Sequence, residues 1–243
     1  NTNSSNPIGG DRTVRFVLTD NAGGGSGNID TTVTVQSLTV DTASDVSDGN
    51  TSSLAALWAN KGADGKISLR EAIAAANASA GTDTIRFQIG TGAQTINIAS
   101  ALPIITDTII IDGTTQSGWV AGSFLPILLD GGSIAAHGLQ LSSTADGSTI
   151  QGLVIRDFGI RGIQVDAGSD GNTIQGNFIG QFTNSGTNAG AGEGNDSSGI
   201  RVDAATGNII GGATAAQRNL ISGNLANGVR LNGAPSTTVQ GNY

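Results

Sequence analysis

The chain has 243 residues, of which 38 are glycine, while only 4% are aromatic and 12% are charged. This composition excludes collagen, which needs glycine at every third position, and a disordered linker, which would lack the many Ile, Val and Leu between the turns. A net charge of -8 argues against binding to a nucleic-acid backbone or an anionic membrane surface. Without cysteine there is no disulfide and no thiolate metal site. No apolar stretch approaches the roughly 20 residues of a transmembrane helix, so we expect no membrane insertion.

The first segment, residues 1–37, predicts a β-hairpin with strands at Thr13–Leu18 and Thr31–Val35. The stretches Arg12–Asp20 and Asp30–Val35 resemble the last two strands of the cadherin-like or immunoglobulin-like repeats of giant bacterial surface proteins, and the rest of such a repeat is missing. A lone hairpin is marginal in water, so we expect it to pair with the body of the chain or with a neighbouring copy. The residues expected at an inter-subunit contact are Val14, Phe16, Leu18, Val33 and Val35, together with Tyr243 in the last coil.

Residues 38–83 contain the helical part of the chain and form a predicted amino-terminal cap. Ser68 and Glu71 make a capping box, in which the hydroxyl and the carboxylate satisfy free N–H groups at a helix start. The apolar residues that follow fall on one helical face: Leu69, Ala72, Ile73 and Ala76. A shorter apolar segment, Ser53–Trp58, predicts a second helical turn.

Residues 84–243 consist of short β-rich runs separated by Gly, Asn and Asp. One register of strands begins at Gly138, Gly162, Gly199 and Gly228, which are 24, 37 and 29 residues apart. Only the loops vary in length, as stacked coils require, because each coil buries its apolar face against the coils above and below. Three short strands per repeat fit one coil that advances about 4.8 Å. We therefore predict an all-β fold: a right-handed parallel β-helix with three strands per coil, a short α-helical amino-terminal cap and an amino-terminal β-hairpin.

A third register of strands contains Ile155, Ile179 and Ile221, and a second one consists of Thr149–Gly152, Thr173–Gly176, Ile209–Gly212 and Thr238–Gly241. Asparagine recurs after this second register. Asn177 and Asn242 directly follow the glycine that ends such a strand, and Asn219 follows it after a short insertion. We expect these three side chains to stack as a structural ladder at an inner turn, with their amides hydrogen-bonded along the axis. The stretch 181–194, rich in Gly, Asn and Thr, suggests a mobile surface excursion.

The helical segment Asp64–Asn77 resembles the CSLREA motif of secreted bacterial β-helix proteins, with Ile67 in place of the cysteine. Three later segments look like the repeats that follow this motif in those proteins: Gly176–Gly180, Ser198–Asp203 and Arg218–Asn224. The resemblance covers roughly residues 38–243 and implies a bacterial protein that is extracellular or on the cell surface. Asn1 does not start a signal peptide, which predicts a further segment upstream. The resemblance implies the fold more than the function, because β-helices serve lyases, hydrolases, epimerases, adhesins and inert stalks.

Asp166 and Asp203 are the candidate catalytic carboxylates, with Arg201 beside them. Both follow a first-register strand, so stacking would place them one coil apart, about 5 Å, where they could share a cation or a proton. The alternative is that aspartate stands at strand ends because it accepts turn geometry. The outward positions of the same strands are Gln140, Gln164, Arg201 and Arg230. These side chains could bind a sugar chain, or they could form a solvated sheet face. Arg156 and Arg161 are further candidates.

Four aspartates in or near a polar stretch are candidate calcium ligands: Asp41, Asp45, Asp48 and Asp64. The spacing of an EF-hand loop is absent, and solvated turn residues are the alternative. Calcium is the one cofactor for which the sequence offers ligands. His137 precedes a strand and has no visible catalytic partner. Trp58 is expected to pack beside Leu54 and Leu57 of the cap, whereas Trp119 fits packing or stacking on a sugar.

An extracellular structural or adhesive scaffold is the function that the sequence favours. Uncapped β-helix ends expose backbone groups and apolar core. We therefore expect head-to-tail self-association, with the last coil of one copy covered by the hairpin or cap of the next in an open filament. The competing hypotheses are a polysaccharide lyase or epimerase that uses Asp166 and Asp203, and a passive polysaccharide-binding module. Whether the chain is an enzyme stays open, with a non-catalytic role favoured.

Overall fold

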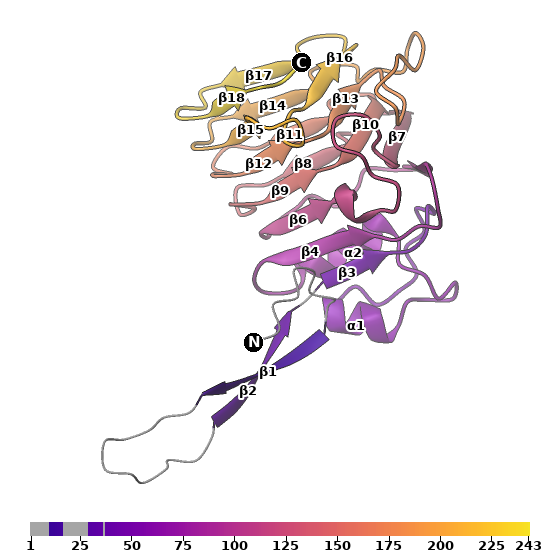
Figure 1. Cartoon of the computed structure of the whole chain (residues 1–243), viewed down its shortest axis with the longest axis vertical. Coiled ribbons are helices and arrows are strands. Elements are labelled where there is room, and N and C mark those ends of the chain that lie inside the picture. Colours follow the sequence, from indigo (N-terminus) through magenta and orange to yellow (C-terminus); the bar gives the residue numbers. More distant parts are fainter. Residues whose placement is uncertain (1–9, 17–28, 36) are drawn as a thin grey trace.

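The structure, a computed structural model, describes residues 10–16, 29–35 and 37–243, with side chains from residue 38 onward. β1 (Gly10–Phe16) and β2 (Ile29–Val35) pair in antiparallel register. They form a two-stranded sheet of their own, which projects beyond the β3 end of the molecule (Figure 1). The predicted hairpin is therefore confirmed, and within the described ranges it adds no strand to the sheets of the body.

Three parallel sheets make up the body of the molecule. The seven-stranded sheet contains β3 (Ser37–Val40), β4 (Asp83–Phe87), β6 (Ile109–Asp112), β9 (Thr149–Gln151), β12 (Thr173–Gln175), β15 (Ile209–Gly211) and β18 (Thr238–Gln240). The five-stranded sheet contains β5 (Gln94–Asn97), β7 (Ile127–Ile134), β10 (Leu153–Phe158), β13 (Phe178–Gly180) and β16 (Leu220–Ser222). The four-stranded sheet contains β8 (Leu139–Leu141), β11 (Ile163–Val165), β14 (Ile200–Asp203) and β17 (Val229–Asn232).

Each full coil gives one strand to each sheet, as β9, β10 and β11 do. The molecule is therefore a right-handed parallel β-helix with three strands per coil, as predicted, and the hand is the one that parallel crossover connections adopt. The predicted strand registers are those of the three sheets. In the four-stranded sheet, for example, Gln164 pairs with Gln140 on one side and with Arg201 on the other.

A single apolar core runs along the axis of the helix. Alternate residues of each strand point inward, so that β14 reads buried, partly buried, buried, partly buried. Equivalent inward residues of successive coils then stack in columns, one of which is Ile111, Ile150, Ile174 and Ile210 in the seven-stranded sheet. Because these columns extend through every coil, the coils are packed into one continuous body and do not form separate domains.

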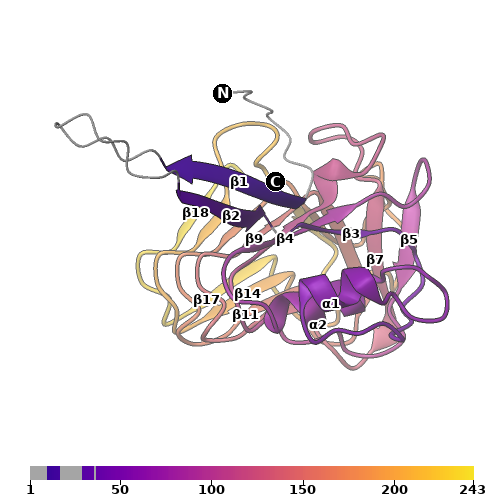
Figure 2. The same ribbon diagram turned by 90° about the horizontal axis from the view of Figure 1, so that it is seen from below.

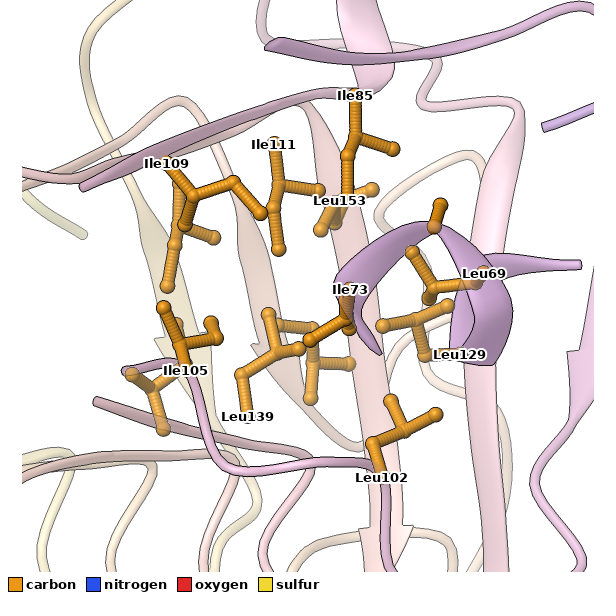
Figure 3. Packing of buried hydrophobic residues seen from close by; sticks show 14 of the residues in the cluster. Leu69, Ile73, Ile85, Leu102, Ile105, Ile109, Ile111, Leu129, Leu139 and Leu153 are labelled. Carbon is orange, nitrogen blue, oxygen red and sulfur yellow. The ribbon is translucent and has the colours of Figure 1, made fainter. Parts of the chain in front are cut away.

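Two helices cover the first end of the β-helix, α1 (Leu54–Ala59) and α2 (Leu69–Asn77). Seen from below, they lie in front of the stacked coils (Figure 2). Leu69 and Ile73 of α2 reach the core beside Leu102, Leu129 and Leu139 (Figure 3). The helices have six and nine residues, and no helix in the described ranges is long and apolar enough to cross a membrane.

A second apolar cluster covers the outside of the five-stranded sheet. Two excursions of the chain fold over this face, residues 113–126, which open with the short 3₁₀ turn η1 (Gly113–Thr115), and residues 181–197. The cluster consists of Leu125, Leu128, Val154, Phe178 and Phe182, with Trp119 and Leu220 packed against it. The two excursions also bond to each other, since the Leu125 N–H donates to the Asn184 carbonyl at 2.9 Å. The stretch that its composition marks as a mobile excursion is thus packed against the sheet.

Candidate functional site

The outward side of the four-stranded sheet collects the candidate catalytic residues. We call it the four-stranded face: the outward side chains of β8, β11, β14 and β17 and the residues that directly flank these strands. Sheet register places Arg201 between Gln164 and Arg230 of the neighbouring coils. Asp166 and Asp203 follow the paired residues Val165 and Val202, so they lie one coil apart as expected.

Each of these two carboxylates is bound by an amide from the coil before it. Gln140 Nε2 donates to Asp166 Oδ2 at 2.7 Å, and Gln164 Nε2 donates to Asp203 Oδ2 at 3.0 Å. Asp203 also accepts from Asn232 Nδ2 at 2.7 Å and forms an ion pair with Arg201 at 2.8 Å. The carboxylates therefore join successive coils to each other and are not bonded to one another.

The protonation of Asp203 follows from these partners. Burial alone would raise its pKa, but the hydrogen bonds from Asn232, Arg201 and Gln164 outweigh burial, and the pKa is lowered. A carboxyl group that acts as a general acid needs a raised pKa. When two carboxyl groups share a proton, the pKa of one of them is raised. The lowered pKa keeps Asp203 ionised, and both carboxylates are held by side chains of the neighbouring coils, which favours the interpretation that they are structural residues at strand ends.

His137 and Arg161 stand at the entrance of the four-stranded face, one residue before Gly138 and Gly162. The Gly138 N–H donates to the Arg161 carbonyl at 2.9 Å, which fixes the two side chains on neighbouring coils. Burial first, and then the charge of Arg161, lower the pKa of His137 from its ordinary value of 6.5, so the imidazole is neutral at pH 7. The sequence alone showed no partner for His137, and in the structure this residue lies near the guanidinium group of Arg161.

Asparagine ladders hold all three corners of the β-helix. The predicted ladder is present: the Asn177 N–H donates to Asn219 Oδ1 at 3.0 Å, and the Asn219 N–H donates to Asn242 Oδ1 at 3.1 Å. A second ladder, missed in the sequence, precedes the strands of the seven-stranded sheet, where the Asn172 N–H donates to Asn208 Oδ1 at 2.8 Å. Both residues directly precede second-register strands, and this shared position was the signal that could have revealed them.

The third corner joins Phe158, Asn195 and Asn224. The Phe158 N–H donates to Asn195 Oδ1 at 3.1 Å, and Asn195 Nδ2 donates to Asn224 Oδ1 at 2.7 Å. Asn195 lies near the end of a long excursion and Asn224 follows β16, so no common spacing announces this pair in the sequence. Each coil of the later part of the molecule is thus tied to the next by buried amides as well as by strand pairing.

Carboxylates of the cap are used to hold loops. In the capping box, the Ser68 N–H donates to Glu71 Oε2 at 2.9 Å and the Glu71 N–H donates to Ser68 Oγ at 3.2 Å. The other carboxylate oxygen of Glu71 accepts the N–H groups of Asp48 and Gly49 at 2.8 and 2.7 Å. Glu71 is 1% exposed, so this one side chain joins the start of α2 to the loop before α1.

The four aspartates considered as calcium ligands each have a protein partner. Asp41 accepts from the Ile67 N–H, Asp45 forms an ion pair with Arg70 at 2.6 Å, Asp48 accepts from the Ala63 N–H, and Asp64 accepts from the Lys66 N–H. In the described part of the chain, no three carboxylate or histidine side chains gather closely enough to hold a metal ion. The structure therefore does not assemble these aspartates into a calcium site, and it uses them as loop-binding groups.

The remaining candidates lie apart from the four-stranded face. Trp58 is 61% exposed with Lys61 Nζ 4.5 Å from its ring centre, so the expectation that it packs in the cap is wrong. Arg156 is held on the five-stranded sheet by Asp130 at 2.8 Å and Glu193 at 3.1 Å.

The residues expected at an inter-subunit contact divide between the two ends of the molecule. Tyr243 is 69% exposed in the last coil, where its N–H donates to the Asn219 carbonyl and Arg218 lies over its ring. Four other residues of this expected contact lie on β1 and β2, namely Val14, Phe16, Val33 and Val35. Leu18 falls outside the described residues.

Asp83 is an ionisable residue that sequence reasoning missed. It opens β4, is 3% exposed, and its Oδ2 has no hydrogen-bond partner. Burial, and after it the charge of Asp107, raises the pKa of Asp83 to about 6.

The class of protein that this geometry defines is a parallel β-helix whose corners are joined by amide ladders and whose first end is covered by a helical cap. Comparison of the chain with protein-family models, with curated proteins and with solved structures found no match.

Proposed function

We propose that the chain is a structural scaffold, a rigid segment of a protein on the outside of a bacterial cell. The observation that carries this proposal is the use of its polar groups: the amides at three corners and the carboxylates of the four-stranded face bond one coil to the next. Hydrogen bonds between buried polar groups help to fix one arrangement of a fold. The extracellular location rests on the resemblance of the SLREA segment and the later repeats to secreted β-helix proteins.

We also propose that copies of the chain associate head to tail. Leu231 and Val239 continue the buried columns of Val202 and Ile210, and in the last described coil they are 42% and 45% exposed. The same coil presents the unpaired edges of β16, β17 and β18. At the opposite end β1 and β2 form a separate two-stranded sheet, which is marginal alone and gains stability by adding to another edge. A second copy supplies complementary surfaces at both ends.

Electron microscopy and sedimentation of the purified chain test this proposal. We expect residues 1–243 to form filaments, and we expect the truncated chain 37–243 and the variant Leu231→Asp to remain monomeric. Val120→Asp is the matched control, because Val120 is 53% exposed on a lateral excursion, and this variant is expected to polymerise. A monomeric wild-type chain at high concentration would exclude self-assembly.

A further inference from the structure

Three arginines crowd the four-stranded face, and two of them lack a carboxylate partner. Arg201 pairs in register with Arg230, and Arg161 lies one coil away on the other side. Asp203 neutralises Arg201 at 2.8 Å. Among the residues from 38 onward, no carboxylate lies within salt-bridge distance of Arg161 or Arg230. The face carries three arginines against the two carboxylates Asp166 and Asp203, and so has a small excess of positive charge in a chain whose net charge is -8.

This positive charge acts on the neighbouring groups. Burial first, and then the charge of Arg201, lower the pKa of Arg161; Arg230 adds to this effect, whereas the carboxylates of Asp203 and Asp166 oppose it without reversing it. An arginine stays protonated at neutral pH even so, which means that the repulsion between these guanidinium groups persists in the folded chain. A bound anion would relieve this repulsion, as carboxylates do in arginine ion pairs.

Polar atoms without partners lie in the same area. Arg161 Nε, His137 Nδ1 and Gln164 Oε1 are buried and make no hydrogen bond. Gln164 is 2% exposed, and its amide nitrogen is already used by Asp203 and by the Val165 carbonyl. Buried polar atoms are nearly always bonded in folded proteins, and each exception calls for a ligand, a water molecule or another explanation. Here an unused donor of Arg161 and an unused acceptor of Gln164 lie in one coil, three residues apart.

We propose that the four-stranded face binds a linear acidic polysaccharide, whose anionic groups pair with Arg161 and Arg230 and whose hydroxyl groups bond to the partly exposed carboxylates of Asp166 and Asp203. Arg161 is partly exposed and Arg230 is exposed, so a ligand can reach both. Arg161 precedes β11 and Arg230 lies in β17, two coils further on and roughly 10 Å along the axis, a separation that suits an extended polymer better than a small ion. The inference does not depend on whether copies of the chain assemble into filaments.

Two features favour a polysaccharide over a nucleic acid. The carboxylates of Asp166 and Asp203 flank the arginines and would repel a dense row of phosphates, and the overall charge of -8 opposes such a polyanion. A uronic-acid chain carries one charge per sugar and offers hydroxyl donors that bond to carboxylates.

Binding of the intact chain to three polysaccharides tests the proposal, by calorimetry in buffers of low and physiological salt. Polygalacturonate supplies carboxylates, heparin supplies sulfates as well, and dextran is the neutral control. The double variant Arg161→Gln/Arg230→Gln is expected to weaken binding by at least about tenfold, because it removes both unpaired guanidinium groups. The double variant Lys61→Gln/Lys66→Gln removes the same two charges from the cap and is expected to bind within about twofold of wild type.

Binding to polygalacturonate, with or without binding to heparin, supports the proposal, whereas binding to heparin alone would show a preference for dense polyanions and would overturn it. Equal weakening in the two double variants would mean that net charge and not this face governs binding, and the proposal would fail. It would also fail if the wild-type chain bound neither polyanion, or bound dextran as tightly. Thermal unfolding of each variant shows that the fold is intact, and filament formation is scored separately.

Discussion

Asn172 and Asn208 lie in successive coils, and the backbone N–H of Asn172 donates to Asn208 Oδ1 over 2.8 Å while both side chains are 1% exposed. Asn172 also offers its own Oδ1 to the Ser148 N–H at 2.8 Å and its Nδ2 to Ser169. One side chain therefore satisfies polar groups in two coils at a corner where strand pairing is interrupted.

Substitution of Asn172 by alanine is expected to lower the free energy of unfolding by roughly 2–4 kcal/mol, because it leaves the buried Ser148 N–H without an acceptor and removes one of the two amide donors to the Ser169 carbonyl, the other being Asn208 Nδ2 at 3.2 Å. Denaturant unfolding, followed by circular dichroism, measures the change. Asn227→Ala is the control, since Asn227 is exposed, and it should shift stability by less than about 0.5 kcal/mol. Equal effects of the two substitutions would show that the ladder contributes little.

Glycine at the start of the first-register strands is explained by close approach of the next coil. A Cβ at Gly162 would lie 2.7 Å from the Gly199 carbonyl oxygen and 2.7 Å from Ile179 Cγ2, whereas a Cβ at Gly228 would meet nothing nearer than Ile221 Cγ2 at 3.4 Å. None of these glycines needs a left-handed backbone. The regular glycine that revealed the repeat is thus a consequence of coil stacking at this corner.

The pair Gly162→Ala and Gly228→Ala tests this explanation within one register. Gly162→Ala is expected to cost about 2–3 kcal/mol or more, because backbone must move to admit the methyl group, and Gly228→Ala is expected to cost under about 1 kcal/mol. Midpoints of denaturant unfolding give both values. A large loss for Gly228→Ala would point to a conformational need for glycine and not to crowding.

The coils could be predicted from the sequence because apolar and polar residues alternate along the strands, and because the strands keep the same length from one repeat to the next. The second cluster could not, because Leu128, Val154 and Phe178 occupy positions that a solvated face would fill with polar residues, and only the fold shows what covers them. The four-stranded face was found through its repeated Gln and Arg positions. The roles of Asp166 and Asp203 depend on cross-coil partners up to 39 residues away, which no local pattern reveals.

Phe182 anchors the excursion of residues 181–197, being 7% exposed with its ring centre 6.0 Å from that of Phe178. Phe182→Ala is expected to release this excursion while the coils stay folded. The Leu125 N–H, which donates to the Asn184 carbonyl, should then exchange with solvent at least about tenfold faster. Hydrogen exchange measured by mass spectrometry tests this, with Val120→Ala as the exposed control. Unchanged exchange at Leu125 would show that the excursion is held by its backbone alone.

Asp83 makes the stability of the chain depend on pH. Its pKa is raised to about 6 in the folded chain, against 3.8 for an ordinary aspartate, so the folded state holds the proton more tightly than the unfolded state. The stabilising effect of this proton is full below about pH 4 and is lost as the pH rises through 6. At 1.36 kcal/mol per pKa unit, the loss from this group is on the order of 3 kcal/mol at pH 8.

Asp83→Asn removes the ionisation and is expected to stabilise the chain at pH 8 by up to about 3 kcal/mol, because a neutral amide replaces a buried carboxylate. The difference between the unfolding free energies of variant and wild type should increase between pH 4 and pH 7 and then level off. Denaturant unfolding at several pH values measures this difference, with the exposed Asp196→Asn as a control that is expected to show no such change. A difference that stays constant with pH would mean that Asp83 titrates normally, and that the unpartnered Oδ2 reaches solvent in the folded chain.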